Sequence, residues 1–165
     1  MGHAEVNWSD EVPQRRGAFV KVLNPRPGQE VRGIVCCNTI RGVLTHYRMR
    51  RTIPCTLPRN ECVGCQDRLS QRWKGYLPIL VPSTGQVALA ELTPEAIRGC
   101  PIARDGKQPI AGMILVCRRA GPSPNSRQVL TLDPTLVPLP AVRYQDVDQL
   151  LLRMWAGESH AEVME

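Results

Sequence analysis

Four candidate metal ligands fall within twenty consecutive residues of this 165-residue chain. They are spaced H-x8-C-x6-C-x2-C, and they are His46, Cys55, Cys62 and Cys65. Structural zinc sites use four tetrahedral nitrogen or sulfur ligands, and three cysteines with one histidine form a standard set. The intervening segment has too few apolar side chains to fold around a core of its own. We therefore predict that a structural Zn²⁺ ion organises a loop over residues 45–66.

Other interpretations of these residues remain open. A C-x2-C pair also marks thiol redox sites, although the βαβ setting of thioredoxin-type motifs is absent here. Unligated thiols are a further alternative, and His46 is the weakest of the four predicted ligands. Cys36 and Cys37 could substitute for it, although adjacent strand residues point to opposite faces. Gly64 lies in the C-x2-C turn, where we expect it to allow unusual backbone dihedrals.

The seven cysteines indicate reduced thiols, because a disulfide framework normally uses an even number. The N-terminal segment has no apolar core of a signal peptide, so we expect a cytoplasmic protein. The chain has no run of about 18 apolar residues, so we expect no transmembrane helix and no membrane partner. The remaining cysteines are expected to pack as small apolar side chains; they are Cys36, Cys37, Cys100 and Cys117.

The positive charge is concentrated in one segment. Between Arg41 and Lys74 there are eight basic and two acidic residues, a net charge of 8 − 2 = +6. The rest of the chain has 13 basic and 13 acidic residues, so this segment accounts for the whole net charge of +6. A local basic surface indicates contact with a polyanion, and a solvated arginine-rich loop is the alternative.

Strand-like segments at short spacing dominate the remainder of the chain. They cover residues 18–23, 31–47, 75–82, 86–92, 110–119 and 127–132. Residues 66–73 and 93–100 have the pattern of short helices, the second with Thr93 as N-cap and Pro94 at the first helical position. Pro78 suggests that its strand lies at a sheet edge. An amphipathic helix is predicted over 144–156, ending at Gly157.

These elements predict a mainly β fold, an OB-like small β-barrel with an inserted zinc loop and a C-terminal α-helix. The domain is expected to span residues 18–157. Residues 1–17 form a flexible N-terminal arm in this interpretation, and residues 158–165 form an acidic tail.

Aromatic residues lie among the basic ones, and together they indicate single-stranded nucleic acid. Cations neutralise phosphates, and aromatic rings stack on bases at roughly 1–3 kcal/mol each. Tyr47 stands among arginines, and Trp73 and Tyr76 flank Lys74 in "RWKGY". Covering of the barrel is the alternative role for Trp73 and Tyr76. The predicted nucleic-acid contacts are Arg41, Tyr47, Arg48, Arg50, Arg51, Arg59, Arg72, Trp73, Lys74 and Tyr76.

The chain has no Gly-rich phosphate loop, no G-x-S-x-G elbow and no paired carboxylate motif. Glu61 precedes Cys62, but no H-x-E element accompanies it as in zinc deaminases. A catalytic zinc would also keep an open coordination position. We therefore predict that the protein is not an enzyme.

The pattern of His46, Cys55, Cys62 and Cys65, followed by the cluster "RWKGYLPIL", resembles the zinc-containing single-stranded-DNA-binding proteins of T-even-type bacteriophages. The spacers are shorter here, and the long acidic tail of that family is reduced to "GESHAEVME". The resemblance implies sequence-independent binding of single strands, a structural zinc, protein partners in replication or recombination, and a phage or mobile-element source.

The function predicted from the sequence is binding of single-stranded nucleic acid, DNA ahead of RNA, by a zinc-stabilised domain. A zinc-stabilised adaptor whose arginines bind an acidic protein partner is the alternative. An accessory subunit of a nucleic-acid-processing enzyme is a third possibility.

Overall fold

A computed structural model describes residues 20–139 and 147–159 of the chain. It is mainly β, with eight strands and four helices in the described ranges. In chain order they are β1 (Val22–Leu23), β2 (Glu30–Val35), β3 (Arg41–Arg48), β4 (Arg51–Pro54), α1 (Val63–Gln66), β5 (Arg72–Val81), β6 (Gln86–Leu92), α2 (Pro94–Gly99), α3 (Pro101–Asp105), β7 (Ile114–Arg119), β8 (Gln128–Asp133) and α4 (Val147–Ser159). The predicted arm at 1–17 and residues 160–165 of the predicted tail lie outside the described residues.

The strands form one mixed sheet in the order β1-β6-β5-β2-β7-β8, and β3 and β4 extend it beside β5. Strand β1 runs parallel to β6, and the other pairs are antiparallel. The ten-residue β5 is the central strand, because it pairs with β6 on one side and with β3 and then β2 on the other. The prediction of an edge strand was therefore wrong. Pro78 lies between the segments of β5 that pair with β3 and with β2.

Glycine allows β2 to cross β5 closely. A Cβ atom at Gly33 would lie 2.9 Å from the carbonyl oxygen of Leu80 and 2.8 Å from the Ile79 side chain. No other side chain fits this gap without moving the backbone. The predicted segment 31–47, a long strand or a bent pair, forms two strands, β2 and β3, and the break lies at residues 36–40 rather than at Gly33 or Gly42.

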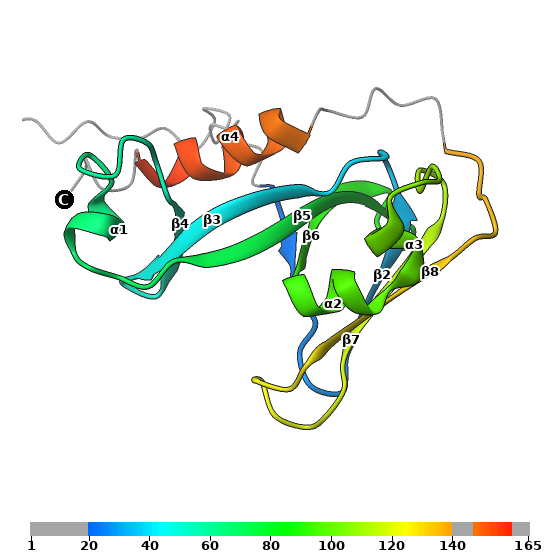
Figure 1. The fold of residues 1–165 in the computed structure, drawn as a ribbon. Coiled ribbons are helices and arrows are strands. Elements are labelled where there is room, and N and C mark those ends of the chain that lie inside the picture. The colour runs from blue at the N-terminus through cyan, green and yellow to red at the C-terminus, as the bar shows by residue number, and fades with distance from the viewer. Residues whose placement is uncertain (1–19, 140–146, 160–165) are drawn as a thin grey trace, which may run out of the picture.

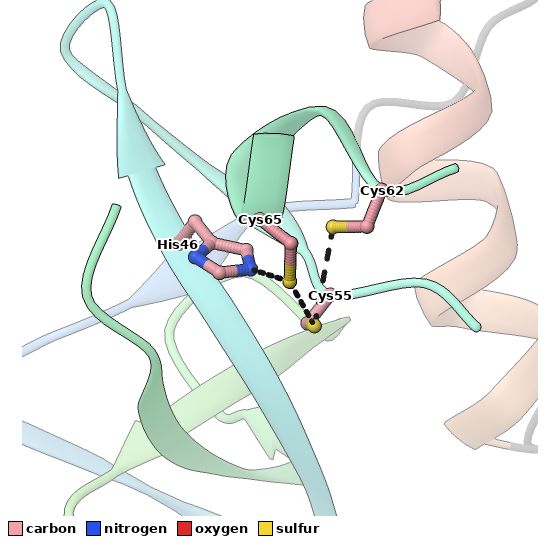
Figure 2. A group of neighbouring side chains, drawn as sticks. All are labelled: His46, Cys55, Cys62 and Cys65. Carbon is pink, nitrogen blue, oxygen red and sulfur yellow. Dashed lines mark hydrogen bonds between the residues drawn. The ribbon is translucent and has the colours of Figure 1, made fainter. Parts of the chain in front are cut away.

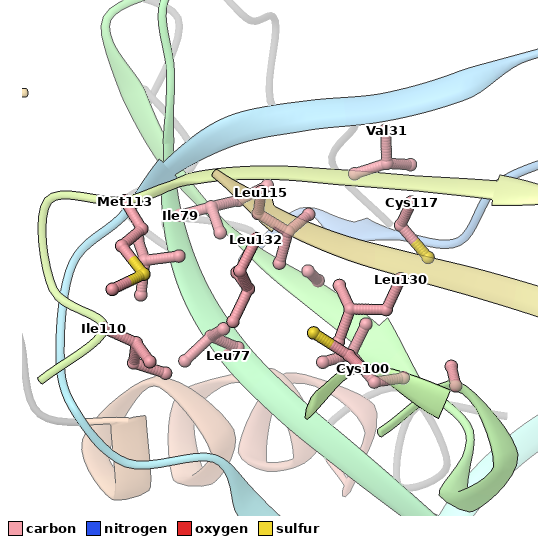
Figure 3. Close-up of a cluster of buried hydrophobic side chains, with 14 residues drawn as sticks. Val31, Leu77, Ile79, Cys100, Ile110, Met113, Leu115, Cys117, Leu130 and Leu132 are labelled. Carbon is pink, nitrogen blue, oxygen red and sulfur yellow. The ribbon is translucent and has the colours of Figure 1, made fainter. Parts of the chain in front are cut away.

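Two apolar clusters cover the two faces of β5. The larger lies inside the curve of the sheet and includes Leu77, Ile79 and Leu115, all 0% exposed (Figure 3). The smaller joins Tyr76 and Leu89 to α4, which lies on the opposite side of the sheet from α2 (Figure 1). The metal-ligand segment projects from one end of this body. Strand β5 therefore connects the core to that segment.

The sheet is open, because its order ends at β1 and β8 and no backbone pairing among the described residues joins β8 to β1 or to β6. The OB-type barrel predicted from the sequence is therefore not confirmed. A buried side chain spans the opening instead. Gln128 of β8 accepts a hydrogen bond from the N–H of Thr93 at 2.7 Å and donates to the carbonyl of Glu91 at 2.8 Å. Its amide satisfies two backbone groups at the end of β6 that lack a strand partner there.

Gln128→Ala should destabilise the fold. The change leaves the Thr93 N–H and the Glu91 carbonyl without partners in the interior, and each such group costs about 1–3 kcal/mol. We expect the free energy of unfolding, measured by urea denaturation, to fall by about 2–4 kcal/mol. Gln86→Ala, at an exposed position of β6, is the control and should change it little. Equal losses in both variants would contradict the bridging role of Gln128.

Local signals located several elements correctly. Strand β6 has the predicted bounds, and the Thr93 side chain accepts the N–H of Ala96 as the predicted N-cap of α2. The helix expected at 66–73 was wrong, because α1 ends at Gln66 and β5 begins at Arg72. Helix α4 continues through Gly157 to Ser159, so glycine does not end it and the predicted tail begins within the helix. Residues 144–146 of that prediction lie outside the described range.

Candidate metal centre

The four predicted ligands converge on one point. His46 lies on β3, Cys55 directly follows β4, and Cys62 and Cys65 lie at the start of α1 and within it. One ligand atom from each lies within 4.8 Å of the others (Figure 2). The cluster could therefore hold a metal ion.

The spacing of the ligand atoms matches a tetrahedral site. Around one ion with ordinary zinc bond lengths, two sulfurs are about 3.8 Å apart and a sulfur and a nitrogen about 3.6 Å apart. The Sγ of Cys55 lies 3.6 Å from that of Cys65 and 3.9 Å from that of Cys62. The Sγ of Cys65 lies 3.5 Å from Nε2 of His46. Three edges of the tetrahedron thus have the expected length.

The imidazole of His46 has the correct nitrogen facing the cluster. Its Nδ1 lies 3.1 Å from the carbonyl oxygen of Leu69, and that oxygen can only accept, so Nδ1 carries the proton. In neutral imidazole Nε2 then has the free lone pair, and Nε2 is the atom beside Cys65. Ligating histidines commonly donate their other N–H in this way. The His46 side chain is 1% exposed, so the packing around it holds the ring in this orientation.

Gly64 is required for space rather than for an unusual dihedral. It is absent from the glycines with positive φ, so the role predicted for it was wrong. A Cβ atom at Gly64 would overlap the imidazole ring of His46. The short helix α1 therefore lies directly against that ring, and this close contact brings Cys62 and Cys65 to the cluster.

The surroundings of the thiols shift the pKa of Cys62 and the pKa of Cys65 in opposite directions. Burial raises the pKa of Cys62, but hydrogen bonds from the backbone of Cys65 and Thr56 outweigh it and lower the pKa to about 6. Burial raises the pKa of Cys65, and the thiols of Cys55 and Cys62 raise it further, to about 11. Thiolates that lie close together repel one another, which is one reason why Cys55 and Cys62 raise the pKa of Cys65. A metal cation among them would attract all three sulfurs and favour three thiolates. Gln71 also donates its side-chain N–H to Cys55 Sγ at 3.1 Å.

The other four cysteines do not belong to the cluster. Cys36, Cys100 and Cys117 are buried in the core, and Cys37 is half-buried against it, as predicted. Burial raises the pKa of both Cys36 and Cys117 to about 12. None of the seven cysteines, all of which lie in the described ranges, forms a disulfide. Cys36 and Cys37 therefore do not replace His46.

The metal ligands bracket a basic hairpin. Strands β3 and β4 pair from Thr45–Pro54 to Arg48–Arg51, which leaves only Met49 and Arg50 in the turn. We call residues 46–55 the clamped hairpin, because His46 and Cys55 stand at its two ends. The N–H of Cys55 also bonds the carbonyl of Leu44 at 2.7 Å. The segment has three arginines and no acidic residue.

Tyr76 does not contribute to an exposed surface. Its side chain is 1% exposed, and its ring meets that of Trp155 edge-on at 6.0 Å under α4. The prediction that Tyr76 stacks on bases is therefore withdrawn. Trp73 and Tyr76 also point to opposite faces of β5, because side chains alternate along a strand and these two are three residues apart.

The indole ring of Trp73 packs closely against two glycines, Gly42 and Gly75. A Cβ atom at Gly42 would come within 2.5 Å of its indole, and one at Gly75 within 3.0 Å. Gly42 and Gly75 face each other across β3 and β5, and Leu44 faces Trp73. Trp73 remains 37% exposed and Leu44 43% exposed. Tyr47, 58% exposed, lies on the other face of β3.

Three of the predicted cationic contacts are paired within the protein. Arg41 meets Asp148 at 2.9 Å, Arg48 meets Asp67 at 2.7 Å, and Lys74 meets Glu91 at 2.8 Å. The remaining four are exposed, and none has an ion pair among the described residues; they are Arg50, Arg51, Arg59 and Arg72. These four are the cations most available to an anionic ligand.

Comparison with known proteins leaves the function to be argued from this geometry. No family model, curated protein or solved structure matches the chain. The resemblance to phage proteins accordingly stays a prediction. Across the described ranges, no helix is both long and apolar enough to cross a lipid bilayer.

Proposed function

We propose that the protein binds single-stranded nucleic acid, DNA ahead of RNA, through a zinc-stabilised basic hairpin and without sequence preference. The observation that carries the proposal is the position of the metal ligands at both ends of the clamped hairpin. Arg48, Arg50 and Arg51 are thereby held on a short, fixed scaffold. A fixed row of guanidinium groups suits a ligand with regularly repeated anions, such as a phosphate backbone.

Zinc is the proposed ion because the ligand set is three thiolates and one imidazole in tetrahedral spacing. Four protein ligands would close the coordination sphere, so the ion supplies folding energy and no catalysis. This supports a binding protein rather than an enzyme.

The bases would stack on the exposed aromatic rings. Trp73 offers an indole whose lower face is held by Gly42 and Gly75. Tyr47 offers a second ring on the opposite face of the ribbon, and Arg72 lies between them in register beside Thr45. A nucleic-acid strand that stacks on both rings would pass from one face of the paired strands β3 and β5 to the other. Stacking tolerates any base, which agrees with binding that is independent of sequence.

The finer fold assignment belongs to the same proposal. Strands β2, β5, β6, β7 and β8, joined across their gap by Gln128, would form an OB-like barrel with β3, β4 and α1 inserted. OB folds bind single strands with a basic groove and aromatic platforms. We place the proposed activity in the cytoplasm. The proposed partners are proteins of replication or recombination, as the resemblance of the motif to phage proteins implies.

Charge reversal on the clamped hairpin should weaken binding to single strands. For Arg50→Glu/Arg51→Glu, we expect the affinity for a labelled dT oligonucleotide to fall at least about tenfold in fluorescence anisotropy. Loss of two phosphate contacts should also make the slope of log K against log salt shallower by about 1.4. Arg98→Glu/Arg104→Glu is the control, because it has the same net charge but lies on α2 and α3. Equal losses in the two variants would rule out a specific role for the hairpin.

A zinc-stabilised protein adaptor is the second candidate, and the exposed apolar side chains favour it. Six of the eight large apolar side chains exposed among the described residues lie between positions 44 and 73, including Leu57 at 83% and Val63 at 45%. Exposed apolar side chains near arginines would suit an acidic partner protein that also exposes apolar side chains. Absence of oligonucleotide binding by the zinc-loaded protein at low salt would favour this candidate.

A further inference from the structure

The tip of the clamped hairpin has an unusual backbone. Met49 has φ 47° and Arg50 has φ 65°, so both residues of the two-residue turn are left-handed. Turns of this kind match the twist of antiparallel strands, but they favour Asn-Gly or Gly-Gly because other side chains clash with the backbone. Among the described residues, Arg68 is the one further non-glycine with positive φ. The tip therefore keeps a methionine and an arginine where glycine would be more stable.

The methionine is also presented outward. Met49 is 76% exposed, and Nη1 of Arg48 lies 4.0 Å from its sulfur. Arg48 is itself held by Asp67 through Nε at 2.7 Å. At the base of the hairpin, His46 and Cys55 belong to the metal cluster. An apolar, polarisable side chain thus stands at the end of a narrow, braced hairpin, in contact with Arg48 and next to Arg50 and Arg51 in the sequence.

We propose that Met49 is a wedge that enters between two adjacent bases of the bound strand, with Arg50 and Arg51 on the flanking phosphates. This rests on the proposed nucleic-acid function and adds the contact that the tip makes. Wedges of this kind are apolar side chains that separate a base step while nearby cations bind the backbone. The unbranched thioether fits the irregular gap between bases. Within the described part of the protein, burial does not account for Met49, since its side chain is exposed and contacts Nη1 of Arg48.

The test uses the full-length, zinc-loaded protein and a single-stranded oligonucleotide with 2-aminopurine inside a run of adenines. The fluorescence of 2-aminopurine rises when the base loses its stacked neighbours, so insertion is read directly. We expect wild-type protein to raise it several-fold at saturation. Met49→Gly should abolish the rise at saturation and lower the affinity in anisotropy, because a base contact is lost, but it should leave the salt dependence unchanged, because every arginine remains. Met49→Leu, which stays apolar, should retain the rise.

Two controls separate the outcomes. Leu136→Ala changes an exposed apolar side chain outside the hairpin and should leave the rise unchanged. Urea denaturation should show Met49→Gly at least as stable as wild type, because glycine accepts positive φ, so loss of the rise is not caused by unfolding. A rise of equal size in Met49→Gly, or binding by the wild type without a rise, would overturn the wedge and leave the proposed function standing. Absence of any binding by the wild type would overturn both.

Discussion

Cys62→Ser will weaken metal binding by more than about a hundredfold and unfold the clamped hairpin together with α1, while the rest of the sheet stays folded. The reason is the lack of an apolar core in this part of the chain. Between residues 45 and 70 only four residues are buried, and two of them are candidate ligands; they are Thr45, His46, Cys62 and Gly64. Structural zinc contributes about 10–16 kcal/mol in small zinc peptides, so the proposed ion would take the place of a core here.

The measurements follow the metal and the chain separately. Zinc affinity, from competition with a chromophoric chelator, should fall by more than about a hundredfold, since loss of a direct ligand exceeds the effect of removing an outer partner. Limited trypsin digestion should then cut after Arg50, Arg51 and Arg59, and we expect the folded hairpin and loop of the wild-type protein to resist cleavage there. Binding of the dT oligonucleotide should be lost with the metal.

Cys37→Ser is the matched control, because Cys37 is a half-buried thiol outside the cluster. It should bind zinc as the wild type does and resist trypsin at the same sites. The large apolar cluster around Leu115 does not depend on the metal, so urea unfolding of Cys62→Ser should still be cooperative. Zinc bound at wild-type affinity by Cys62→Ser would show that the four residues do not form the site.

Gly64→Ala will weaken the metal site without removing a ligand. The added methyl group would occupy the space of the His46 ring, so either α1 moves or the imidazole leaves its position against the Leu69 carbonyl. A shift of either kind spoils the tetrahedral spacing. We expect zinc affinity to fall about 10- to 100-fold, as when outer-shell geometry is lost, and the free energy of unfolding to fall by about 1–3 kcal/mol.

Gly99→Ala provides the comparison for this variant. Gly99 ends α2, and nothing lies within 4 Å of a Cβ placed there. Alanine is favoured over glycine in helices, so this variant should be as stable as the wild type or slightly more stable. If Gly64→Ala also keeps wild-type zinc affinity, α1 tolerates a displacement that the close contact with His46 argues against.

The elements with local signals were predictable from the sequence. Thr93 and Pro94 marked α2 because capping is a property of a few adjacent residues. The ligand set was equally accessible, because cysteine spacing constrains which thiols can reach one ion. The packing of Gly64 against His46 and the contact of Gln71 with Cys55 leave no such trace, because they depend on where α1 and the strands meet.

The prediction that Tyr76 stacks on bases was wrong because its surroundings, too, depend on how distant elements pack. An aromatic residue among arginines has the pattern of a stacking platform, and its burial depends on α4, about seventy residues later, packing on the same face of β5. Trp73, three residues earlier, points to the other face and remains exposed. The alternation of side chains would have separated the two if the start of β5 at Arg72 had been known.

The candidate metal ligands lie close together in the sequence, whereas the strands that form the core pair with strands far along the chain. All four ligands come from twenty consecutive residues, so this part of the protein can form as soon as Cys65 has left the ribosome. The core cannot, since Glu30 of β2 pairs with Arg118 of β7 and Gln128 bonds Glu91. Contacts over long sequence separations form slowly because the intervening loop must be closed. A metal ion could therefore bind before the sheet is complete during synthesis, and in the proposed zinc protein this binding would be the earliest step of folding.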